Sequence, residues 1–350
     1  MTNILPKLIL PAEFETHAAT WMIWPYRLDT WHDGARPARV AYAEVANAIS
    51  LFEKVNMIIR KEDREFAKTL LNKSIEFFNI PFDSEWTRDT GPLFVKDKNG
   101  KIFGIDFKFN SWGEIYSDYK LDDRLAIKIT ESLRFPLLQN NLVLEGGQIL
   151  VDGEGTLITT EECFFNDKRK DIYSKDELNE IFRRYFGITK TIWIKRGMYK
   201  DIVNGHIDNL CSFARPHLIT LAWTDDKRDP QYEISKEAFE ILSSSTDAKG
   251  RSFEIVKIHQ PDPLFVTEEE GNVVGESFYK KGDRLCSSYV NFYIVNGGVI
   301  VPKYGDKKYD KLAQAKLSTI FKDRKLVQIA SKEIILGGGG IHCITMQQPV

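Results

Sequence analysis

Hydrophobic and polar positions repeat one order of elements along the chain: two short apolar runs around a turn, an amphipathic helix, and a third apolar run. Most of the turns between the paired runs are rich in Gly, Asn and Asp, which is typical of β-hairpins. We therefore predict four hairpins, with strands at residues 93–95 and 102–107, 149–151 and 157–159, 210–213 and 218–222, and 291–295 and 299–301.

A helical pattern and then a single strand follow each predicted hairpin. We expect the helices at residues 122–133, 174–185, 235–242 and 309–321, and the strands at residues 141–144, 191–194, 253–258 and 326–329. The second helix is the best marked, because Ser174 and Glu177 have the spacing of a capping box and Gly187 follows its end.

The start of the chain contains a fifth, imperfect copy of this order. It predicts a strand at residues 19–24, a helix at 39–54 and a strand at 55–59, followed by a helix at 62–71 and a strand at 76–80. No Pro/Ser-rich linker divides the chain, so we expect one α/β domain over residues 1–350. Because a single module cannot bury its apolar face alone, the modules should pack around a common axis.

The composition fits a folded globular chain and excludes several classes of partner. Of the 350 residues, 43% are hydrophobic and 28% are charged, which excludes a disordered chain. The formal net charge is -2, so we expect neither nucleic acid nor a membrane surface as a partner. The sequence shows no secretory signal and no apolar run long enough to span a bilayer, and we expect a cytoplasmic protein.

The four cysteines point to neither disulfides nor zinc. They lie far apart, and none has the spacing of a CxxC pair or of a Cys/His zinc site; they are Cys163, Cys211, Cys286 and Cys343. A lone cysteine is usually a small buried hydrophobic residue. Cys343 departs from this default because four glycines precede its Ile-His pair.

Ionisable residues and glycines collect in the loops that join the last strand of one module to the next hairpin. The loops carry WTRDTGP at 86–92, EGG at 145–147, GHIDN at 205–209 and GGGGIHC at 337–343. If the modules surround an axis, these loops converge at one end of it. One pocket then holds the thiol of Cys343, the imidazole of His206 and the carboxylates of Asp89 and Asp208, with Glu145 as a further candidate.

This combination of groups favours a cationic substrate. A thiol and an imidazole suit nucleophilic attack with proton transfer to a leaving group. Carboxylates around them destabilise a thiolate and repel an oxyanion, which does not suit a peptidase. A guanidinium fits, because it is planar, permanently charged and offers paired N–H donors to a carboxylate. We expect attack of the Cys343 sulfur on a guanidinium carbon. We prefer His206 to His342 as acid/base, because neighbours on an extended chain point to opposite faces.

Each of these residues also has a purely structural interpretation. Asp89 and Asp208 fit as caps of backbone N–H groups in turns, and His206 fits as a hydrogen-bonded structural histidine. Trp86 fits the core as well as a pocket wall. The fifth joining segment contains three consecutive glutamates at residues 268–270. We interpret them most simply as part of a solvated loop and assign this segment no catalytic role.

Over nearly its whole length the sequence resembles the agmatine deiminase family, within the wider group of guanidine-modifying enzymes that includes bacterial peptidylarginine deiminases. The motifs are WTRDTGP at 86–92, FNSWGE at 109–114, LEGG at 144–147, GHIDN at 205–209, SYVNFYIVNGG at 288–298 and GGGGIHCITMQQP at 337–349. Two positions depart from the family pattern: Gly340 stands where Asn is usual, and Met346 where Gln is usual.

The resemblance implies a five-module α/β propeller with pseudo-fivefold symmetry and an active site on its axis. It implies that agmatine and water give N-carbamoylputrescine and ammonia, without a metal or an organic cofactor, and it suggests a homodimer. The implied roles are nucleophile for Cys343, general acid/base for His206, guanidinium-holding carboxylates for Asp89 and Asp208, and lining of the site for Trp86 and Glu145.

Two other functions remain open at the level of the sequence. The same machinery would serve deimination of arginine, free or within peptides, because the sequence does not show the pocket details that would reject it. A non-catalytic guanidine-binding protein is the alternative from another class. It would require a missing nucleophile or a broken carboxylate set, and the chain has both groups.

Overall fold

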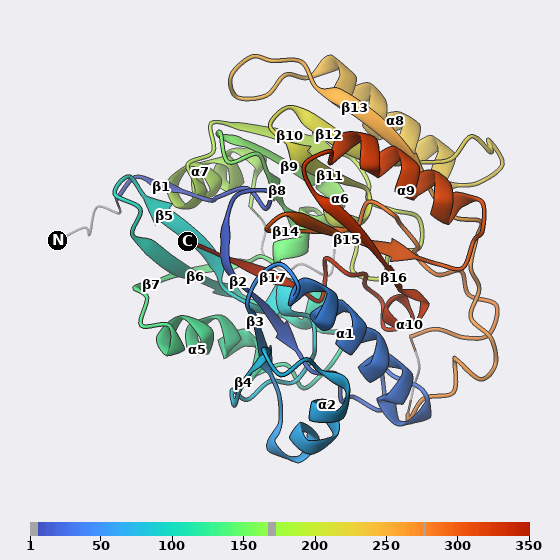
Figure 1. Cartoon of the computed structure of the whole chain (residues 1–350). Helices are drawn as coiled ribbons and strands as arrows, with labels where there is room; N and C mark the ends of the chain where they lie inside the picture. The colour runs from blue at the N-terminus through green and yellow to red at the C-terminus, as the bar shows by residue number, and fades with distance from the viewer. Residues whose placement is uncertain (1–5, 167–172, 276–277) are drawn as a thin grey trace.

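The computed structural model describes residues 6–166, 173–275 and 278–350 (Figure 1). The strands of these residues form five small sheets. The four predicted hairpins are confirmed as antiparallel pairs: β5 (Leu93–Asp97) with β6 (Ile102–Lys108), β8 (Leu150–Val151) with β9 (Thr156–Thr160), β11 (Cys211–Arg215) with β12 (Leu218–Trp223), and β14 (Tyr293–Val295) with β15 (Gly298–Lys303).

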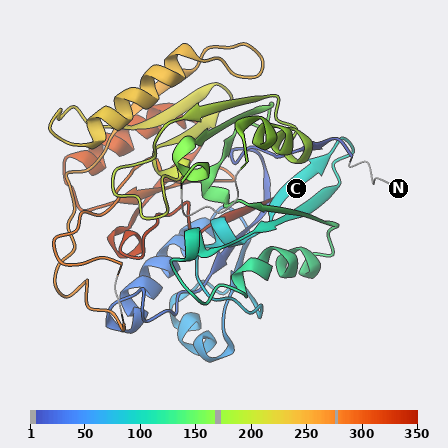
Figure 2. The same cartoon turned by 180° about the vertical axis from the view of Figure 1, so that it is seen from behind.

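The strand that was predicted after each helix is present, and it pairs in parallel with the second strand of the preceding hairpin. These strands are β7 (Leu137–Val143), β10 (Lys190–Ile194), β13 (Glu254–His259) and β16 (Lys325–Ala330). A parallel pair needs a crossover connection, which usually contains a helix. The crossovers contain α5 (Leu125–Ser132), α7 (Lys175–Phe186), α8 (Gln231–Ser244) and α9 (Tyr309–Ile320). These helices lie on the outside of the sheets (Figures 1 and 2).

Local sequence signals set the bounds of some elements well and of others poorly. The capping box of Ser174 and Glu177 is present at the start of α7, and Gly187 ends the helix in the left-handed conformation at φ +73°. In contrast, β7 begins at Leu137 and not at position 141, because the parallel partner β6 extends the pairing to Leu137 opposite Gly104.

The two ends of the chain complete the first module together. Strand β2 (His17–Ile23) pairs in parallel with β3 (Val55–Ile58) across helix α1 (Arg36–Ile49), and its antiparallel partner is the C-terminal strand β17 (Met346–Pro349). In Figure 1 the red β17 lies beside the blue β2. The copy looked imperfect in the sequence because the two strands of its hairpin come from opposite ends of the chain.

The rest of this module follows the prediction in order but not in every bound. Helix α2 (Arg64–Leu70) and strand β4 (Glu76–Phe78) are confirmed. The expectation that the first helix reaches residue 54 was wrong. The helix ends at Ile49 because the chain turns there, so that the Glu53 carboxylate accepts hydrogen bonds from Thr20 Oγ1 and Asn296 N. Strand β1 (Leu8–Ile9), paired with β5, was not predicted.

The joining loops bring distant residues together. Single helical turns form in three of them, at α3 (Thr87–Thr90), η4 (Gly146–Gln148) and η5 (Ile207–Asn209), and the fourth follows α10 (Lys332–Ile335). The Gly147 N–H donates to Asp89 Oδ1 at 2.9 Å, and the Arg88 N–H donates to the Cys343 carbonyl at 3.1 Å. The loops therefore meet at one place, although their residues are spread over most of the sequence. No helix among the described residues is long and apolar enough to cross a membrane.

Candidate active site

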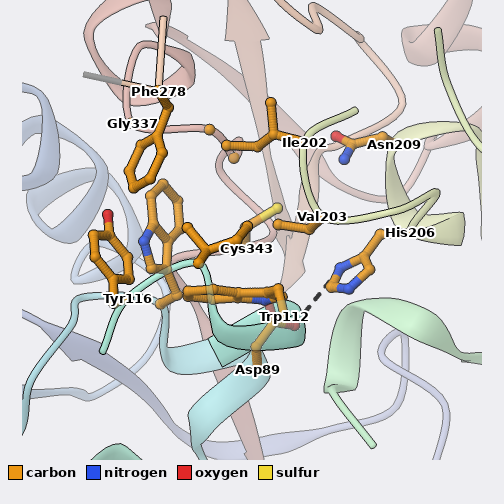
Figure 3. A pocket seen from close by; sticks show the side chains of 14 residues that line it. Asp89, Trp112, Tyr116, Ile202, Val203, His206, Asn209, Phe278, Gly337 and Cys343 are labelled. Atoms are coloured by element: carbon orange, nitrogen blue, oxygen red, sulfur yellow. Dashed lines mark hydrogen bonds and ion pairs between the residues drawn. The ribbon is translucent and has the colours of Figure 1, made fainter. Parts of the chain in front are cut away.

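The joining loops surround a cavity of about 390 Å³ that is mostly apolar (Figure 3). Cys343, Asp89, His206 and Asn209 supply ionisable or amide groups to its wall. The remaining lining residues are aromatic, aliphatic or glycine: Trp86, Trp112, Ile115, Tyr116, Ile202, Val203, Phe278, Gly337, Gly338 and Gly339. A mostly apolar cavity with a few fixed polar groups is typical of a binding site for a small molecule.

Cys343 is held between an aspartate and an asparagine. Its sulfur lies 3.5 Å from Asp208 Oδ2 and 3.5 Å from the Nδ2 donor of Asn291. Asn291 is fixed in turn, because its Oδ1 accepts the His342 N–H at 2.9 Å and its Nδ2 donates to Asn209 Oδ1 at 2.9 Å. The thiol therefore has a defined position at the cavity wall, although only 5% of the residue is exposed.

Asp208 is buried and has one oxygen without a partner. Its Oδ2 lies 2.8 Å from His342 Nδ1, whereas Oδ1 has no hydrogen-bond partner within the described part of the chain. Asp208 is not among the residues that line the cavity and lies behind the Cys343 sulfur. A buried carboxylate oxygen without a donor is costly, so this atom is suited to accept an N–H from a bound ligand.

His206 is oriented by carboxylates on both sides of its ring. Its Nε2 lies 3.1 Å from Glu145 Oε2, and its Nδ1 lies 3.8 Å from Asp89 Oδ1, as the dashed line in Figure 3 marks. Glu145 is fully buried and does not line the cavity; it lies behind the imidazole. The ring thus presents its Nδ1 edge toward Asp89 and the cavity.

Asp89 is fixed by a strained loop that the sequence patterns did not single out. Trp112 Nε1 donates to Asp89 Oδ2 at 2.9 Å. The loop places Ser111, Trp112 and Glu114 at φ between 53° and 65°, a region that non-glycine residues seldom adopt. Such strain persists where the surrounding structure enforces it, often at functional sites. Here it directs an indole N–H at the carboxylate.

The glycine run before Cys343 is required by close packing. A Cβ at Gly339 would lie 2.6 Å from Trp86 and 2.9 Å from the Cβ of Cys343, and a Cβ at Gly337 would lie 2.1 Å from Trp31. At Gly340 a Cβ would lie 2.2 Å from Asn291 Oδ1. The run is therefore closely packed and is not merely a flexible turn. Any larger residue at 340 requires Asn291 to move away from its present position.

Burial and charge set the protonation states in the cavity. Burial lowers the pKa of His206, but Asp89 and Glu145 outweigh it and raise the pKa to about 9, so the imidazole carries a proton at neutral pH. Burial raises the pKa of Asp89, and the charge of His206 opposes this rise. Burial also raises the pKa of the Cys343 thiol well above its usual value, and the charges of Asp208 and Asp89 raise it further. Without a bound cation the sulfur is therefore a thiol.

The structure brings most of the predicted residues to one place and adds others. Cys343, His206, Asp89 and Trp86 line the cavity, while Asp208 and Glu145 lie directly behind this set. The sequence patterns missed Trp112, Tyr116, Asn291, Phe278, Ile202 and Val203. Trp112 lies in the FNSWGE motif and Asn291 in the SYVNFYIVNGG motif, so these motifs were the sequence signal that could have identified them. The fifth joining segment, to which no catalytic role was assigned, supplies Phe278 and ends at Asn291.

A cluster of three acidic residues away from this cavity has the spacing of a cation site. Asp152, Glu154 and Asp247 each bring a carboxylate oxygen within 4.8 Å of the others. Glu154 is already paired with the cationic side chains of Lys249 and Arg251, and Arg251 also pairs with Asp247. These internal ion pairs offset the acidic charge, so the group is better suited to joining two turns than to holding a metal ion.

The fold and the cavity define an α/β protein that gathers a thiol, an imidazole and carboxylates at one place, and comparison with known proteins identifies the family. Residues 9–349 match the model of the Porphyromonas-type peptidyl-arginine deiminase family. Among curated relatives, the chain is 46% identical to agmatine deiminase of Medicago truncatula over 358 residues, which covers 97% of this chain and 96% of the relative. It is 44% identical to agmatine deiminase of Pseudomonas aeruginosa, with coverage of 97% and 95%.

Solved structures agree with this assignment. Agmatine deiminase of Enterococcus faecalis superposes with a TM-score of 0.93 at 36% identity, covering 98% of this chain and 96% of that chain. A dimethylarginine dimethylaminohydrolase (DDAH) of Pseudomonas aeruginosa is similar in fold alone, with a TM-score of 0.51 at 13% identity and coverage of 95% and 99%. The chain belongs to the Porphyromonas-type peptidyl-arginine deiminase family and, within it, to the agmatine deiminase family.

Proposed function

We propose that this protein hydrolyses agmatine to N-carbamoylputrescine and ammonia. The observation that carries the proposal is the position of the Cys343 sulfur, which lies 3.5 Å from Asp208 at the wall of a cavity that also presents Asp89 and His206. A thiol, an imidazole and carboxylates together suit nucleophilic attack on the carbon of a positively charged group. Relatives named agmatine deiminase are 44% to 46% identical to this chain over nearly its full length.

Binding of the guanidinium activates the thiol. Asp89, which lines the cavity, accepts guanidinium N–H groups from the substrate. Asp208 is the second acceptor: it lies beside the Cys343 sulfur, and its Oδ1 has no hydrogen-bond partner within the described residues. The positive charge offsets these two carboxylates, which are the charges that raise the pKa of Cys343. The pKa of the thiol therefore falls when the substrate binds, and the sulfur gives its proton to solvent. The N–H donor of Asn291 then stabilises the thiolate.

In the first half of the reaction, a C–S bond forms and a C–N bond breaks. The thiolate attacks the guanidinium carbon, and protonated His206 gives its proton to one NH₂ group of the tetrahedral adduct. Ammonia leaves with the C–N electron pair, and a cationic amidino thioether remains on Cys343. His206 is then neutral, and Glu145 keeps its ring in place.

In the second half, water replaces ammonia. Neutral His206 takes a proton from water while the oxygen attacks the amidino carbon. The C–S bond breaks, the ureido product forms with loss of one proton, and the thiolate and the imidazolium are restored. The ammonia and the released proton leave as ammonium. Every proton transfer uses His206 or solvent, so the steps require only side chains of this chain.

The lining of the cavity favours agmatine over arginine. Arginine carries an α-carboxylate that agmatine lacks, and a buried carboxylate needs a cationic partner. No Lys or Arg is among the described residues that line the cavity, whereas Trp86, Trp112, Tyr116 and Phe278 offer aromatic faces to the alkyl chain and the distal ammonium. This apolar wall supports agmatine as the substrate and counts against the deimination of free or peptide-bound arginine.

The same resemblance supports a finer description of the fold. We propose that the five sheets are related by pseudo-fivefold symmetry and that the cavity lies on the symmetry axis of a single domain over residues 1–350. The shared order of hairpin, helix and parallel strand in the sheets supports this arrangement. In it, the loops that carry Asp89, Glu145, His206 and Cys343 occupy equivalent positions.

Ammonia release tests the proposed function directly. The wild-type chain should release ammonia from agmatine, and Cys343→Ala should abolish the release while agmatine still binds. The values of kcat/KM for agmatine, arginine and a blocked arginyl peptide should be highest for agmatine. Turnover retained by Cys343→Ala would refute the role of the sulfur, and a higher kcat/KM for either arginine substrate would replace agmatine as the substrate.

A further inference from the structure

A second histidine lies behind the cavity in a line of buried charged groups. His342 Nδ1 lies 2.8 Å from Asp208 Oδ2, and His342 Nε2 lies 2.7 Å from Glu13 Oε2. Glu13 Oε2 also pairs with Arg88 Nη2 at 3.3 Å. The imidazole is thus held at both nitrogens by carboxylates that come from distant parts of the chain.

The charges around His342 favour its protonated form. Asp208 faces it from η5, Glu13 from the segment before β2 and Arg88 from α3, and Cys343 is its neighbour in the chain. Burial and Arg88 lower the pKa of His342, but the two carboxylates outweigh them and the pKa is raised. In the same way, burial raises the pKa of Asp208 and of Glu13, but interactions led by His342 leave both lowered.

His342 does not reach the cavity where the substrate would bind. Cys343 lines that cavity, whereas His342 lines a separate cavity on the other side of the loop, together with Glu13, Arg88 and Gln347. Residues 341–344 form a turn and not the extended strand that the sequence-based argument assumed. His342 Nδ1 and the Cys343 sulfur both contact Oδ2 of Asp208, at 2.8 Å and 3.5 Å, so Asp208 links His342 to the reacting sulfur.

We propose that His342 is a positioning residue: its imidazolium, held by Glu13, occupies Oδ2 of Asp208, keeps this carboxylate ionised beside Cys343, and leaves Oδ1 to accept the guanidinium N–H. The inference rests on the proposed function, because it assigns His342 to the binding of its cationic substrate. Glu13, Arg88 and His342 line the second cavity, whereas Cys343 lines the first.

Ligand binding in the Cys343→Ala background tests this inference without turnover. Replacing His342 with Gln keeps a neutral donor of similar length but removes the positive charge. The Kd of agmatine should rise about tenfold or more, because its cationic head depends on an ionised and oriented Asp208. The Kd of N-carbamoylputrescine, which keeps the distal ammonium but has a neutral ureido head, should change less than about threefold. Retained product binding also shows that the His342→Gln protein is folded.

A second variant tests the support that Glu13 gives to His342. Glu13→Gln removes one carboxylate, so the pKa of His342 falls below its value in the unmodified chain. The ratio of the agmatine Kd in this variant to that in the parent Cys343→Ala protein should rise with pH, as His342 loses its proton at a lower pH than in the parent. His259→Gln is the matched control for His342→Gln. His259 ends β13, stacks on Tyr309 of α9 and lies 3.8 Å from Asp225.

The outcomes separate the two proposals. Equal agmatine affinity with and without His342, or an equal loss for agmatine and for N-carbamoylputrescine, overturns the positioning role and leaves the proposed function intact. If the wild-type chain does not hydrolyse agmatine and Cys343→Ala does not bind it, the proposed function fails and the role of His342 falls with it. A loss of affinity that is selective for agmatine, the ligand with the cationic head, supports both.

Discussion

The Nε2 atom of His206 lies 3.1 Å from Oε2 of Glu145, and both side chains are at most 1% exposed. This contact fixes the orientation of the imidazole, so that Nδ1 is the nitrogen nearer to Asp89 and the cavity. It also contributes to the raised pKa of His206. In the proposed mechanism His206 gives a proton in the first half of the reaction and takes one in the second, and Glu145, which does not line the cavity, sets its orientation and its charge.

Glu145→Gln should lower the pKa of His206 from about 9, because the negative charge that favours the imidazolium is lost. The first half of the reaction needs protonated His206, so activity is lost as the pH rises through this pKa. The alkaline limb of kcat/KM against pH should therefore move to lower pH. Glu333→Gln is the matched control, because Glu333 on α10 also pairs with a histidine, with Oε2 lying 2.9 Å from His32 Nε2. It should leave the alkaline limb of kcat/KM unchanged. An unchanged limb in Glu145→Gln contradicts the assignment.

Trp112→Phe should weaken substrate binding by removing the indole N–H that holds Asp89 Oδ2. A buried carboxylate that loses a donor has a higher pKa and a less defined position, so we expect kcat/KM to fall about tenfold. Trp223→Phe is the matched control, because Trp223 Nε1 donates to the exposed Asp225. If both variants keep wild-type kinetics, the indole N–H has no part in orienting Asp89.

Gly340→Ala should disturb the position of Asn291, since the new Cβ would lie 2.2 Å from its Oδ1. Overpacking at a buried site costs about 1–3 kcal/mol, and the donor to the Cys343 sulfur would move. We expect a lower melting temperature and a kcat/KM reduced roughly tenfold. Gly271→Ala provides the comparison, because its Cβ would make an ordinary contact at 3.5 Å. Equal behaviour of the two variants would show that residue 340 has room for a side chain.

Gln348→Leu should destabilise the pairing of the two chain ends. Gln348 Oε1 accepts the indole N–H of Trp21 at 2.9 Å between β17 and β2. Removing the acceptor leaves a buried donor without a partner, which costs about 1–3 kcal/mol. Thermal and urea unfolding should both report this loss. The exposed Gln314 on α9, replaced by Leu, is expected to show no comparable change.

Thiol labelling should distinguish Cys343 from the other cysteines. A haloacetamidine carries a cationic head like the proposed substrate, so it should lower the pKa of Cys343 on binding and alkylate that residue first. All four cysteines are buried, and burial raises the pKa of Cys211 and Cys286. Peptide mapping after partial inactivation identifies the modified site. The preference should disappear with a neutral haloacetamide of similar size, and labelling of Cys163, Cys211 or Cys286 first would oppose the assignment.

The sequence by itself determined the element order and pointed to most of the polar groups that meet at the cavity. The alternation of apolar positions and the turn residues predicted four hairpins, the helices and the strands that follow them, because these signals are local and depend on residues close in the chain. The joining motifs also pointed to Cys343, His206 and Asp89, since their residue types are unusual for loops. Bounds such as the end of α1 at Ile49 were less certain, because contacts of Glu53 with distant residues decide them.

Only the tertiary structure decided how these groups are arranged. The pairing of β17 with β2 joins the two ends of the chain, and no local pattern encodes a contact over that distance. The placement of Trp112 on Asp89, of Asn291 on Cys343 and of His342 on Asp208 likewise depends on loops from different modules meeting in space. Burial then sets the pKa values of these groups, and burial is a property of the packed chain.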